Sequence, residues 1–347
     1  MTHSVAGGAS GTRSDVPVDQ AVPVTSGFHV DQVVLTDPTF LADPSVDGDG
    51  TGGGAGDPLS YRDADFVLAK IPVVERFIGY FSPEVIGLDH IPATGPAFLV
   101  GNHSCLFWMP DAWVVARSIT ERRGVEQPSY ALGYDLLFKL PVVGEFLRKV
   151  GAIPADGVTA QRALADGDLV LDYPGGDREA CRPWLDRNRV EFGGRTGFVK
   201  LALRTRVPVV PVVTHGSHDA IVVLTRGEHV ARALHLDKLR IKVFPIFLGP
   251  FGVSTILRPP LPLPSAVTVE FLPPFDWSRF GPDAADDPDT VAACYDEITS
   301  AMQAALDRLA AERPHPVLRG IGRLLTGHGL RFLPADPSRT PPGTPDR

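Results

Sequence analysis

The chain has 347 residues, 44% of them hydrophobic, so it can bury a sizeable core, and its composition excludes collagen-like, coiled-coil and wholly disordered proteins. The formal net charge of −8 comes almost entirely from residues 1–57, which hold eight Asp and one Arg, so the acidity does not count against binding to anionic lipid or phosphate. The cysteines at 105, 181 and 294 are widely spaced, which argues against a disulfide framework or a zinc–thiolate site and is typical of a reducing compartment.

Both ends of the chain are poor in residues that build a core. Residues 1–57 are rich in Gly and Asp and are expected to be a disordered acidic tail, and the Pro-rich residues 334–347 a second disordered tail. This leaves one folded domain over 58–333. No targeting sequence is expected, because residues 1–30 lack a basic start followed by an apolar run, and no stretch reads as a membrane-spanning helix.

The hydrophobic pattern predicts helices and strands that alternate along this domain. Apolar residues recur at helical spacing at Val67, Ile71, Val74, Ile78 and Phe81, and the helix they predict contains Pro72. Further helices are expected at 110–123, at 136–149 with interruptions at Pro141 and Gly144, at 197–204 and at 291–312. Strands are expected at 97–100, 168–173, 207–213, 240–247 and 267–272. This alternation indicates an α/β fold, a single layered domain with a mostly parallel or mixed sheet flanked by helices.

The segment GNHSCLFWMPD, residues 101–111, follows directly on a predicted strand. His103 lies at the end of that strand and Asp111 begins a helix, so both are expected at one end of the sheet, where α/β sites usually form. In one continuous helix they would be roughly 12 Å apart, so a loop must fold back to pair them. Paired, Asp111 fixes the tautomer of His103 and leaves the other ring nitrogen as a general base. The structural alternative is a strand cap at His103 and a helix N-terminal acid at Asp111.

The segment YPGGDREACRPW, residues 173–184, places two glycines directly after another predicted strand. Gly175 and Gly176 allow main-chain amides to approach an anion or oxyanion closely, and Arg178 and Glu179 follow at once. A plain turn explains the glycines equally well. Residues 178–206 contain eight Arg or Lys and three acidic residues, which fits either a solvated basic face or a phosphate-binding surface.

Two further patterns bear on function. Residues 66–81, 243–257 and 317–333 are apolar yet too short or too interrupted to span a bilayer, so they are candidates for peripheral membrane contact, and the glycines of 317–333 weaken any helix there. His215, His218 and Asp219 in HGSHD have metal-ligand character, but no second cluster of ligands stands out, and no metal site is expected. The absence of a Gly-x-Ser-x-Gly elbow counts against a serine hydrolase.

Taken in order, these segments resemble the glycerolipid acyltransferase family, which includes the lysophosphatidate acyltransferases. The matching blocks cover about residues 84–216: LDHIPATGPAFLVGNHS with an Asp downstream, LLFKLPVVGEFLRKVGAIPADG, LVLDYPGGDREACRPW and VPVVPVVTHG. The resemblance implies that His103 and Asp111 are catalytic. Gly175, Gly176, Arg178 and Glu179 are the corresponding candidates for binding substrate, with the glycine amides facing the oxyanion or a coenzyme A phosphate.

The chain departs from that family's pattern in its first two blocks. The family usually has four residues between the catalytic His and Asp, whereas seven lie between His103 and Asp111. The second block usually ends with an Arg thought to hold the acceptor's phosphate, but this chain has Ala155 and Asp156 there, with Arg162 as the nearest Arg.

The third block also departs from the family's common Pro-Glu-Gly-Thr-Arg. This chain has Pro174-Gly175-Gly176-Asp177-Arg178-Glu179, which keeps the Arg and replaces the first Glu by Gly. A Pro-Gly-Gly run with a Glu three residues after its second Gly is similar to the branch of diacylglycerol acyltransferases and phytyl ester synthases. Because that branch acylates neutral alcohols, a phosphate-free acceptor is expected as an alternative to lysophosphatidate.

The sequence therefore predicts a membrane-associated acyltransferase that moves a fatty acyl group from acyl-CoA, or acyl carrier protein, to the hydroxyl of lysophosphatidate or of a neutral lipid such as diacylglycerol. A thioester is already activated, so the expected chemistry uses no bound cofactor or metal. The expected location is cytoplasmic and peripheral to a membrane, with no nucleic-acid partner. The alternatives are a hydrolase, metal-dependent or not, that uses His215, His218 and Asp219, or a non-catalytic lipid-binding module.

Overall fold

β2 (Ala97–Gly101) carries the first candidate motif at its end, and all of its residues are buried. The computed structural model describes residues 56–104, 106–236, 242–327 and 329–333. In it the side chains of Phe98 and Val100 belong to one hydrophobic core, and those of Ala97 and Leu99 to another. A strand that is apolar on both faces needs helices on both sides of its sheet.

Within the described residues, eight strands form the main sheet, and most neighbouring pairs are parallel. Among the strands of this sheet that the structure describes, β10 and β6 are the one antiparallel pair, so the sheet is mixed, as expected from the sequence. The order across the sheet is β11 (Arg331–Leu333), β1 (Glu84–Ile86), β10 (Thr268–Phe271), β6 (Val209–His215), β2, β5 (Leu169–Asp172), β3 (Ser129–Gly133) and β4 (Ala152–Pro154). A second, antiparallel sheet consists of β7 (Val222–Thr225), β8 (Ile246–Gly249) and β9 (Gly252–Thr255).

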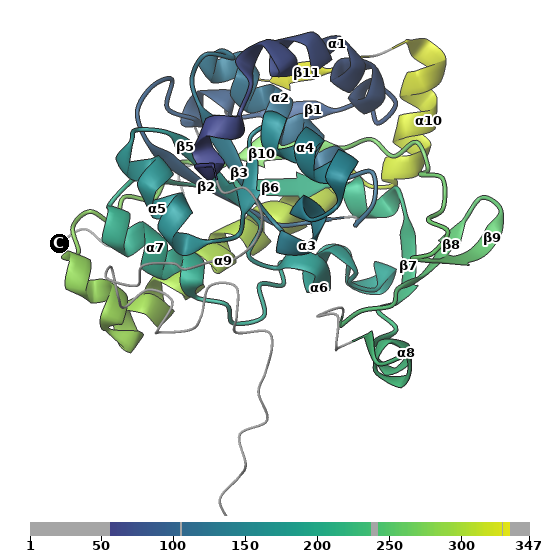
Figure 1. Cartoon of the computed structure of the whole chain (residues 1–347). Coiled ribbons are helices and arrows are strands. Elements are labelled where there is room, and N and C mark those ends of the chain that lie inside the picture. The colour runs from purple at the N-terminus through teal and green to yellow at the C-terminus, as the bar shows by residue number, and fades with distance from the viewer. Residues whose placement is uncertain (1–55, 105, 237–241, 328, 334–347) are drawn as a thin grey trace, which may run out of the picture. The chain divides into compact units, whose positions relative to one another are not determined.

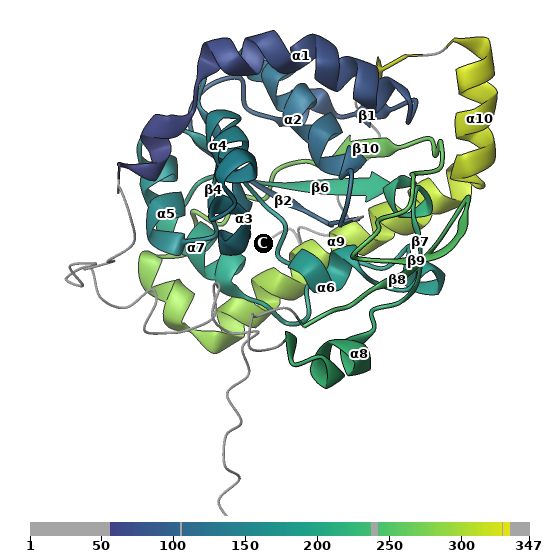
Figure 2. The ribbon, with the colours of Figure 1, turned by 45° about the vertical axis from the view of Figure 1, so that its right-hand side comes forward.

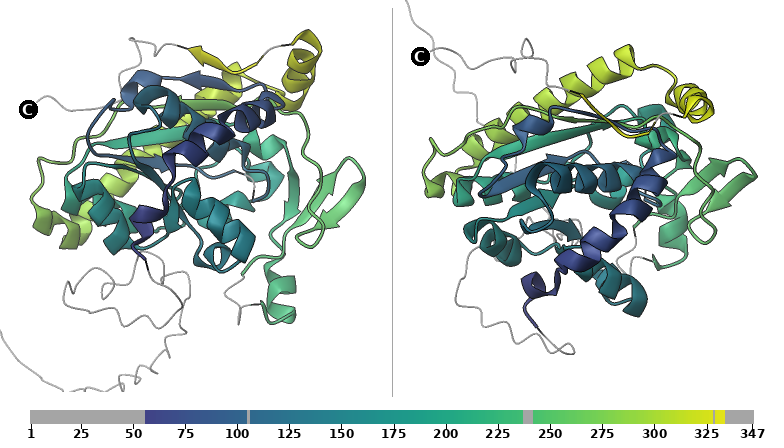
Figure 3. Two further views of the ribbon diagram at one scale, coloured as in Figure 1. Left: turned by 45° about the horizontal axis from the view of Figure 1, so that its top comes forward. Right: turned by 90° about the horizontal axis from the view of Figure 1, so that it is seen from above.

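Helices cover both faces of the main sheet (Figures 1 and 2). α1 (Ala64–Gly79) and α2 (Pro110–Arg123) pack on one face, and Figure 3 shows the sheet between them and the opposite layer. That layer contains α5 (Gly157–Ala165), α7 (Gly197–Thr205) and α9 (Pro288–Glu312). The other helices are α3 (Asp135–Phe138), α4 (Pro141–Lys149), α6 (Gly176–Ala180), α8 (Glu228–Ala233) and α10 (Pro316–Thr326). Single 3₁₀ turns occur at Pro58–Tyr61, Leu88–His90, Trp184–Asp186, Ser217–Asp219 and Pro282–Asp286.

Most of the predicted elements are present, and α1 continues through Pro72. Two predictions are wrong. Gly144 does not interrupt α4 but lies inside it, where the lack of a side chain lets the helix pack on the main chain of Phe138, which a Cβ would overlap. The strand expected at 240–247 is absent over residues 242–245, and β8 begins only at Ile246, directly after a proline that has no N–H to donate to a sheet. Residues 240 and 241 lie outside the described residues.

Other expectations concern the tails and membrane spans. Residues 1–57 and 334–347 lie outside the described residues, apart from Gly56 and Asp57. In the part of the chain that is described, every helix is too short or too polar to cross a bilayer.

Candidate active site

The loop that follows β2 folds back so that His103 and Asp111 meet. His103 Nδ1 lies 3.1 Å from Asp111 Oδ2, and since a carboxylate only accepts, the ring donates its Nδ1–H. The same oxygen accepts the main-chain N–H of Ser104 at 3.0 Å. Asp111 is fully buried in the first turn of α2, whereas His103 stays partly accessible. The pairing fixes one tautomer and leaves Nε2 with a free lone pair, which is the protonation state of a general base.

The length of this loop is used to reach the second sheet. Phe107 packs edge-on against Phe247 of β8, with ring centroids 5.9 Å apart, and Trp108 Nε1 donates to Pro260 O at 3.1 Å. Trp108 and Met109 both have positive φ, 66° and 39°, which costs each of these residues on the order of 1–3 kcal/mol. Pro110 then begins α2, where its fixed φ suits the first helical position. The three residues added to the family's usual spacing thus extend the loop without separating the pair.

A buried ion pair holds the main chain of His103 from both sides. Glu179 Oε2 accepts the His103 N–H at 2.9 Å, and Arg182 Nη1 donates to the His103 carbonyl at 2.8 Å. Glu179 Oε1 accepts the N–H of Glu191 and lies 3.6 Å from Arg182 Nη1. Burial raises the pKa of the Glu179 carboxyl, and the Arg182 guanidinium and these N–H donors oppose that rise. With both oxygens engaged by main-chain N–H groups, Glu179 is placed to hold the main chain of His103, and contact of Glu179 with substrate stays a prediction.

Further contacts fix the ring and the strand end. The Tyr173 ring stacks on the His103 ring, with centroids 4.7 Å apart. A Cβ at Gly101 would overlap the Tyr173 ring. The Asn102 side chain accepts from the N–H of Thr214 and donates to its carbonyl, which ties the end of β2 to the end of β6. Arg182 and Asn102 were not predicted to act at the site. The glycine at 101 in GNHS was an available signal that a side chain packs closely there.

Gly175 and Gly176 lie next to this network, and their role in binding substrate stays a prediction. The N–H of Gly176 donates to Tyr173 O at 2.9 Å, so it is engaged in a turn, and Gly176 has a φ of 52°. A Cβ at Gly175 would overlap the Glu179 carboxylate. Arg178, the predicted charged partner, is partly exposed and forms ion pairs with Glu191 and Glu228.

His215, His218 and Asp219 of HGSHD do not form a shared polar cluster among the described residues. His218 is buried and its Nε2–H donates to Arg182 O at 2.6 Å, while Asp219 contacts Trp184 and Arg187. Burial lowers the pKa of His218 well below its ordinary value and that of His215 to about 4, so both rings are neutral at pH 7. Within the described ranges no three His, Cys, Asp or Glu side chains converge as metal ligands do. His218 and Asp219 therefore hold the chain at Arg182–Arg187 in place.

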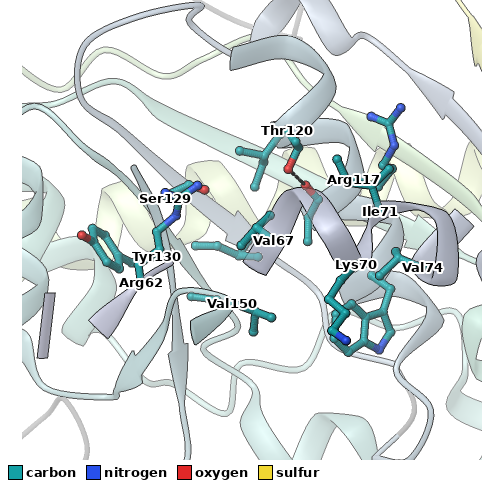
Figure 4. A pocket seen from close by; sticks show the side chains of 15 residues that line it. Arg62, Val67, Lys70, Ile71, Val74, Arg117, Thr120, Ser129, Tyr130 and Val150 are labelled. Atoms are coloured by element: carbon teal, nitrogen blue, oxygen red, sulfur yellow. Dashed lines mark hydrogen bonds between the residues drawn. The ribbon is translucent and has the colours of Figure 1, made fainter. Parts of the chain in front are cut away.

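An apolar groove lies between α1, α2 and the strands beneath them (Figure 4). Trp113 lines it and follows Asp111 by two residues on α2, a spacing that points the two side chains to different sides of the helix. His103 and Asp111 are not among its lining residues. Its remaining lining residues are Arg62, Val67, Lys70, Ile71, Val74, Ala116, Arg117, Ile119, Thr120, Ser129, Tyr130, Ala131, Val150 and Leu171.

Comparison with known proteins shows the family to which the chain belongs. The sequence model of the family described as Acyltransferase matches residues 82–215, which include the paired His103 and Asp111. The uncharacterized protein Rv0502 of Mycobacterium tuberculosis is 33% identical over 254 residues, which are 72% of this chain and 68% of that protein. The chain belongs to the glycerolipid acyltransferase family.

Two other proteins are similar to this acyltransferase. The human protein named DGAT1/2-independent enzyme synthesizing storage lipids is 28% identical over 190 residues, which are 54% of this chain and 56% of that protein. The crystal structure of the 1-acyl-sn-glycerophosphate acyltransferase PlsC from Thermotoga maritima matches with a TM-score of 0.42 and 18% identity, over 73% of this chain and 91% of that one.

Proposed function

We propose that this acyltransferase moves a fatty acyl group from a thioester donor, acyl-CoA or acyl carrier protein, to a lipid hydroxyl, with His103 as the general base. The observation that carries the proposal is the 3.1 Å contact between His103 Nδ1 and Asp111 Oδ2. Because Asp111 is buried and also held by the Ser104 N–H, it orients the ring and stabilises the imidazolium that forms in the reaction.

The steps follow from that geometry. His103 Nε2 takes the proton of the acceptor hydroxyl while the oxygen attacks the thioester carbonyl carbon. The tetrahedral intermediate then collapses, the carbon–sulfur bond breaks, and the thiolate takes the proton back from the imidazolium, so that an ester and a free thiol leave. The turn uses the N–H of Gly176, which donates to Tyr173 O. The N–H of the neighbouring Gly175 is a candidate donor to the oxyanion. Arg178 is a candidate partner for donor phosphate, in competition with Glu191 and Glu228.

The acceptor is proposed to be a neutral lipid alcohol, such as diacylglycerol, used at least as well as lysophosphatidate. Asp156 stands where the family's phosphate-holding Arg is expected, and its side chain caps α5 by accepting the N–H groups of Val158 and Thr159. Arg162, the nearest Arg, contacts Asp57 instead. A dianionic head group would therefore meet a carboxylate at this position. The name of the human relative, which refers to storage lipids, supports the same class of acceptor.

The apolar groove is proposed to hold the fatty acyl chain. Its walls are mainly aliphatic and aromatic side chains of α1, α2 and the strands beneath them, and its lining residue Trp113 lies in the first turn of α2, as Asp111 does. Association with the membrane is proposed to be peripheral, because both substrates carry long acyl chains and segments of the protein surface are apolar. A cytoplasmic location is proposed with it, since Cys181 and Cys294 are free thiols.

Release of free thiol from acyl-CoA tests the proposal. We expect His103→Ala to lower acceptor-dependent thiol release by about 10²- to 10⁴-fold, because the base is lost while the fold is retained. His229→Ala, which removes an exposed histidine on α8, is the matched control and should leave the rate unchanged. Wild-type turnover in a folded His103→Ala variant would contradict the mechanism. A protein that binds lipid but releases no thiol would be the non-catalytic lipid-binding module instead.

A further inference from the structure

α10 turns its arginines inward and its leucines outward. Arg319 and Arg323 contact the buried carboxylate of Glu84 on β1. Leu318, Ile321 and Leu325, spaced three and four residues apart, form a stripe on the exposed side of the helix. A helix normally buries such a stripe and exposes its charges, so the outer face of α10 has the character of a surface that contacts something apolar.

The turn between β8 and β9 exposes a second apolar group. Phe251 lies in the turn, Val253 lies on β9, and Leu257 follows the strand, and all three side chains are mostly exposed. The other side of this sheet is anchored, because Phe247 and Val223 pack with Ile221 and Phe107. The exposed residues are therefore additional to those that hold the sheet together.

The two groups belong to one side of the molecule. The chain that leaves β9 passes under α10, where Gly320 packs so closely on Pro264 that a Cβ would overlap its carbonyl. The N–H of Ala266 also donates to Pro316 O at 2.9 Å, at the start of α10. The views in Figures 1, 2 and 3 all place α10 and the β8–β9 turn on the same side. We call the set Phe251, Val253, Leu257, Leu318, Ile321 and Leu325 the apolar surface.

Positive charge flanks this surface. Glu84 contacts Arg313, Arg319, Arg323 and Arg331, so one carboxylate is shared by four guanidinium groups. Glu312 pairs with Arg313 and Arg308, and Arg308 also pairs with Glu270. These five arginines thus face three glutamates, which leaves the cluster with an excess of arginine. Arg331 is about half exposed and Arg319 partly so. Exposed aliphatic side chains beside a cationic cluster complement an anionic lipid interface, where acyl chains lie just below charged head groups.

The apolar surface is connected to the active-site loop. Phe107 packs on Phe247 of β8, and Trp108 Nε1 donates to Pro260 O, three residues after Leu257. Both aromatic residues lie in the loop between His103 and Asp111. Contact of this surface with a bilayer would therefore hold that loop next to the lipid from which the acceptor comes.

We infer that the apolar surface docks the protein onto the face of an anionic lipid bilayer and so presents the His103–Asp111 loop to membrane-embedded acceptor. This inference rests on the proposed function for the identity of the acceptor, but the docking itself does not depend on catalysis. Of the three segments with apolar character in the sequence, it assigns contact to parts of 243–257 and 317–333. The third segment, 66–81, also exposes Leu68 and Val73 on α1, but no cluster of arginines like that around Glu84 is described beside it.

Flotation of the full chain with liposomes tests the docking. Wild-type protein is expected to bind phosphatidylcholine vesicles that contain phosphatidylserine at least tenfold more tightly than vesicles of phosphatidylcholine alone. Phe251→Asp/Leu325→Asp changes two side chains that are 84% and 83% exposed, so it should leave the fold intact and lower binding to the anionic vesicles at least tenfold.

The matched pair Val253→Asp and Val158→Asp isolates the position of the surface. The two valines are 69% and 63% exposed, and Val158 lies on α5, on the other side of the ribbon in Figures 1 and 2. Only Val253→Asp should weaken vesicle binding. Equal effects of the two variants, or wild-type binding by Phe251→Asp/Leu325→Asp, would overturn the inference. A loss of self-association without a loss of vesicle binding would also overturn it, because the occupant would be a second copy of the chain.

Activity measurements separate this inference from the proposed function. With a water-soluble short-chain donor and acceptor, Phe251→Asp/Leu325→Asp should release thiol at the wild-type rate, and with acceptor embedded in vesicles at a rate at least fivefold lower. If wild-type protein released no thiol from either substrate, the proposed function would fail while the flotation results still decided the docking.

Discussion

Replacing Asp111 by Asn separates the charge of this side chain from its shape. In the wild type, Asp111 Oδ2 lies 3.1 Å from His103 Nδ1 and 3.0 Å from the Ser104 nitrogen. The amide oxygen of Asn takes the place of Oδ2 and keeps both contacts. What is lost is the negative charge that stabilises the imidazolium during the reaction. Hydrogen bonds to charged groups are worth about 1.5–3 kcal/mol, and each 1.36 kcal/mol of barrier is tenfold in rate. We therefore expect kcat to fall by about 10- to 160-fold.

The same substitution should not destabilise the fold. Asp111 is fully buried, and among the described residues no group donates a hydrogen bond to its Oδ1. A buried carboxylate with an unpartnered oxygen costs more free energy than a neutral amide in the same place. The melting temperature of Asp111→Asn should thus equal or exceed that of the wild type, while the rate falls.

Thiol release at saturating acyl-CoA measures the rate, and circular dichroism on heating measures the melting temperature. Asp289→Asn is the matched control, since it makes the same change in the first turn of α9 and should alter neither quantity strongly. The reasoning is refuted if Asp111→Asn keeps the wild-type kcat, or if its lost activity comes with a melting temperature several degrees lower.

Three more outcomes follow from buried groups and from the groove. Arg182→Met should lower the free energy of unfolding by about 3–5 kcal/mol in urea denaturation, because it leaves the buried Glu179 carboxylate without its partner; a loss below about 1 kcal/mol would contradict this. Burial raises the pKa of the Asp172 carboxyl to about 7 from the ordinary 3.8, so the native state retains a proton that the unfolded chain releases. The free energy of unfolding should therefore fall as the pH rises from about 4 to about 7, by at most about 1.4 kcal/mol per pH unit. Asp172→Asn should consequently gain more stability over the wild type at about pH 8 than at about pH 5 in urea titrations, and an equal gain would argue against the raised pKa. Ala116→Phe places a ring in the groove and should shift the preferred acyl-CoA toward shorter chains in a competition assay; an unchanged preference would place the acyl chain elsewhere.

The elements that were predicted correctly have hydrophobic sequence patterns that follow directly from their burial. β6 and β2 are buried along their whole length and α9 carries a long apolar stripe, so hydrophobicity alone indicated them. The second sheet was missed because its outer strands expose apolar residues such as Val253 and do not alternate in the manner of a half-buried strand. α10 was expected to be weakened by its glycines, yet Gly320 is what allows the helix to pack on Pro264.

Residues of the site differ in how well the sequence alone predicts them. His103 and Asp111 follow from their places at a strand end and a helix start. Arg182 does not, because it is one of eight basic residues between 178 and 206, and nothing local indicates that this one is buried while Arg178 is partly exposed. Its role depends on how the chain after β5 folds over the end of β2, and such a long-range arrangement leaves no local pattern.

Gly175 and Glu179 also bear on how the family's motifs can diverge. The carboxylate of Glu179 occupies the space that a side chain at 175 would need, and it holds the main chain of His103 from there. Where the family commonly has a Glu after the Pro, this chain has Gly, and the Glu179 carboxylate fills the space beside it. The two positions are therefore epistatic: a Glu introduced at 175 is excluded while Glu179 is present, but becomes permissible once 179 is small.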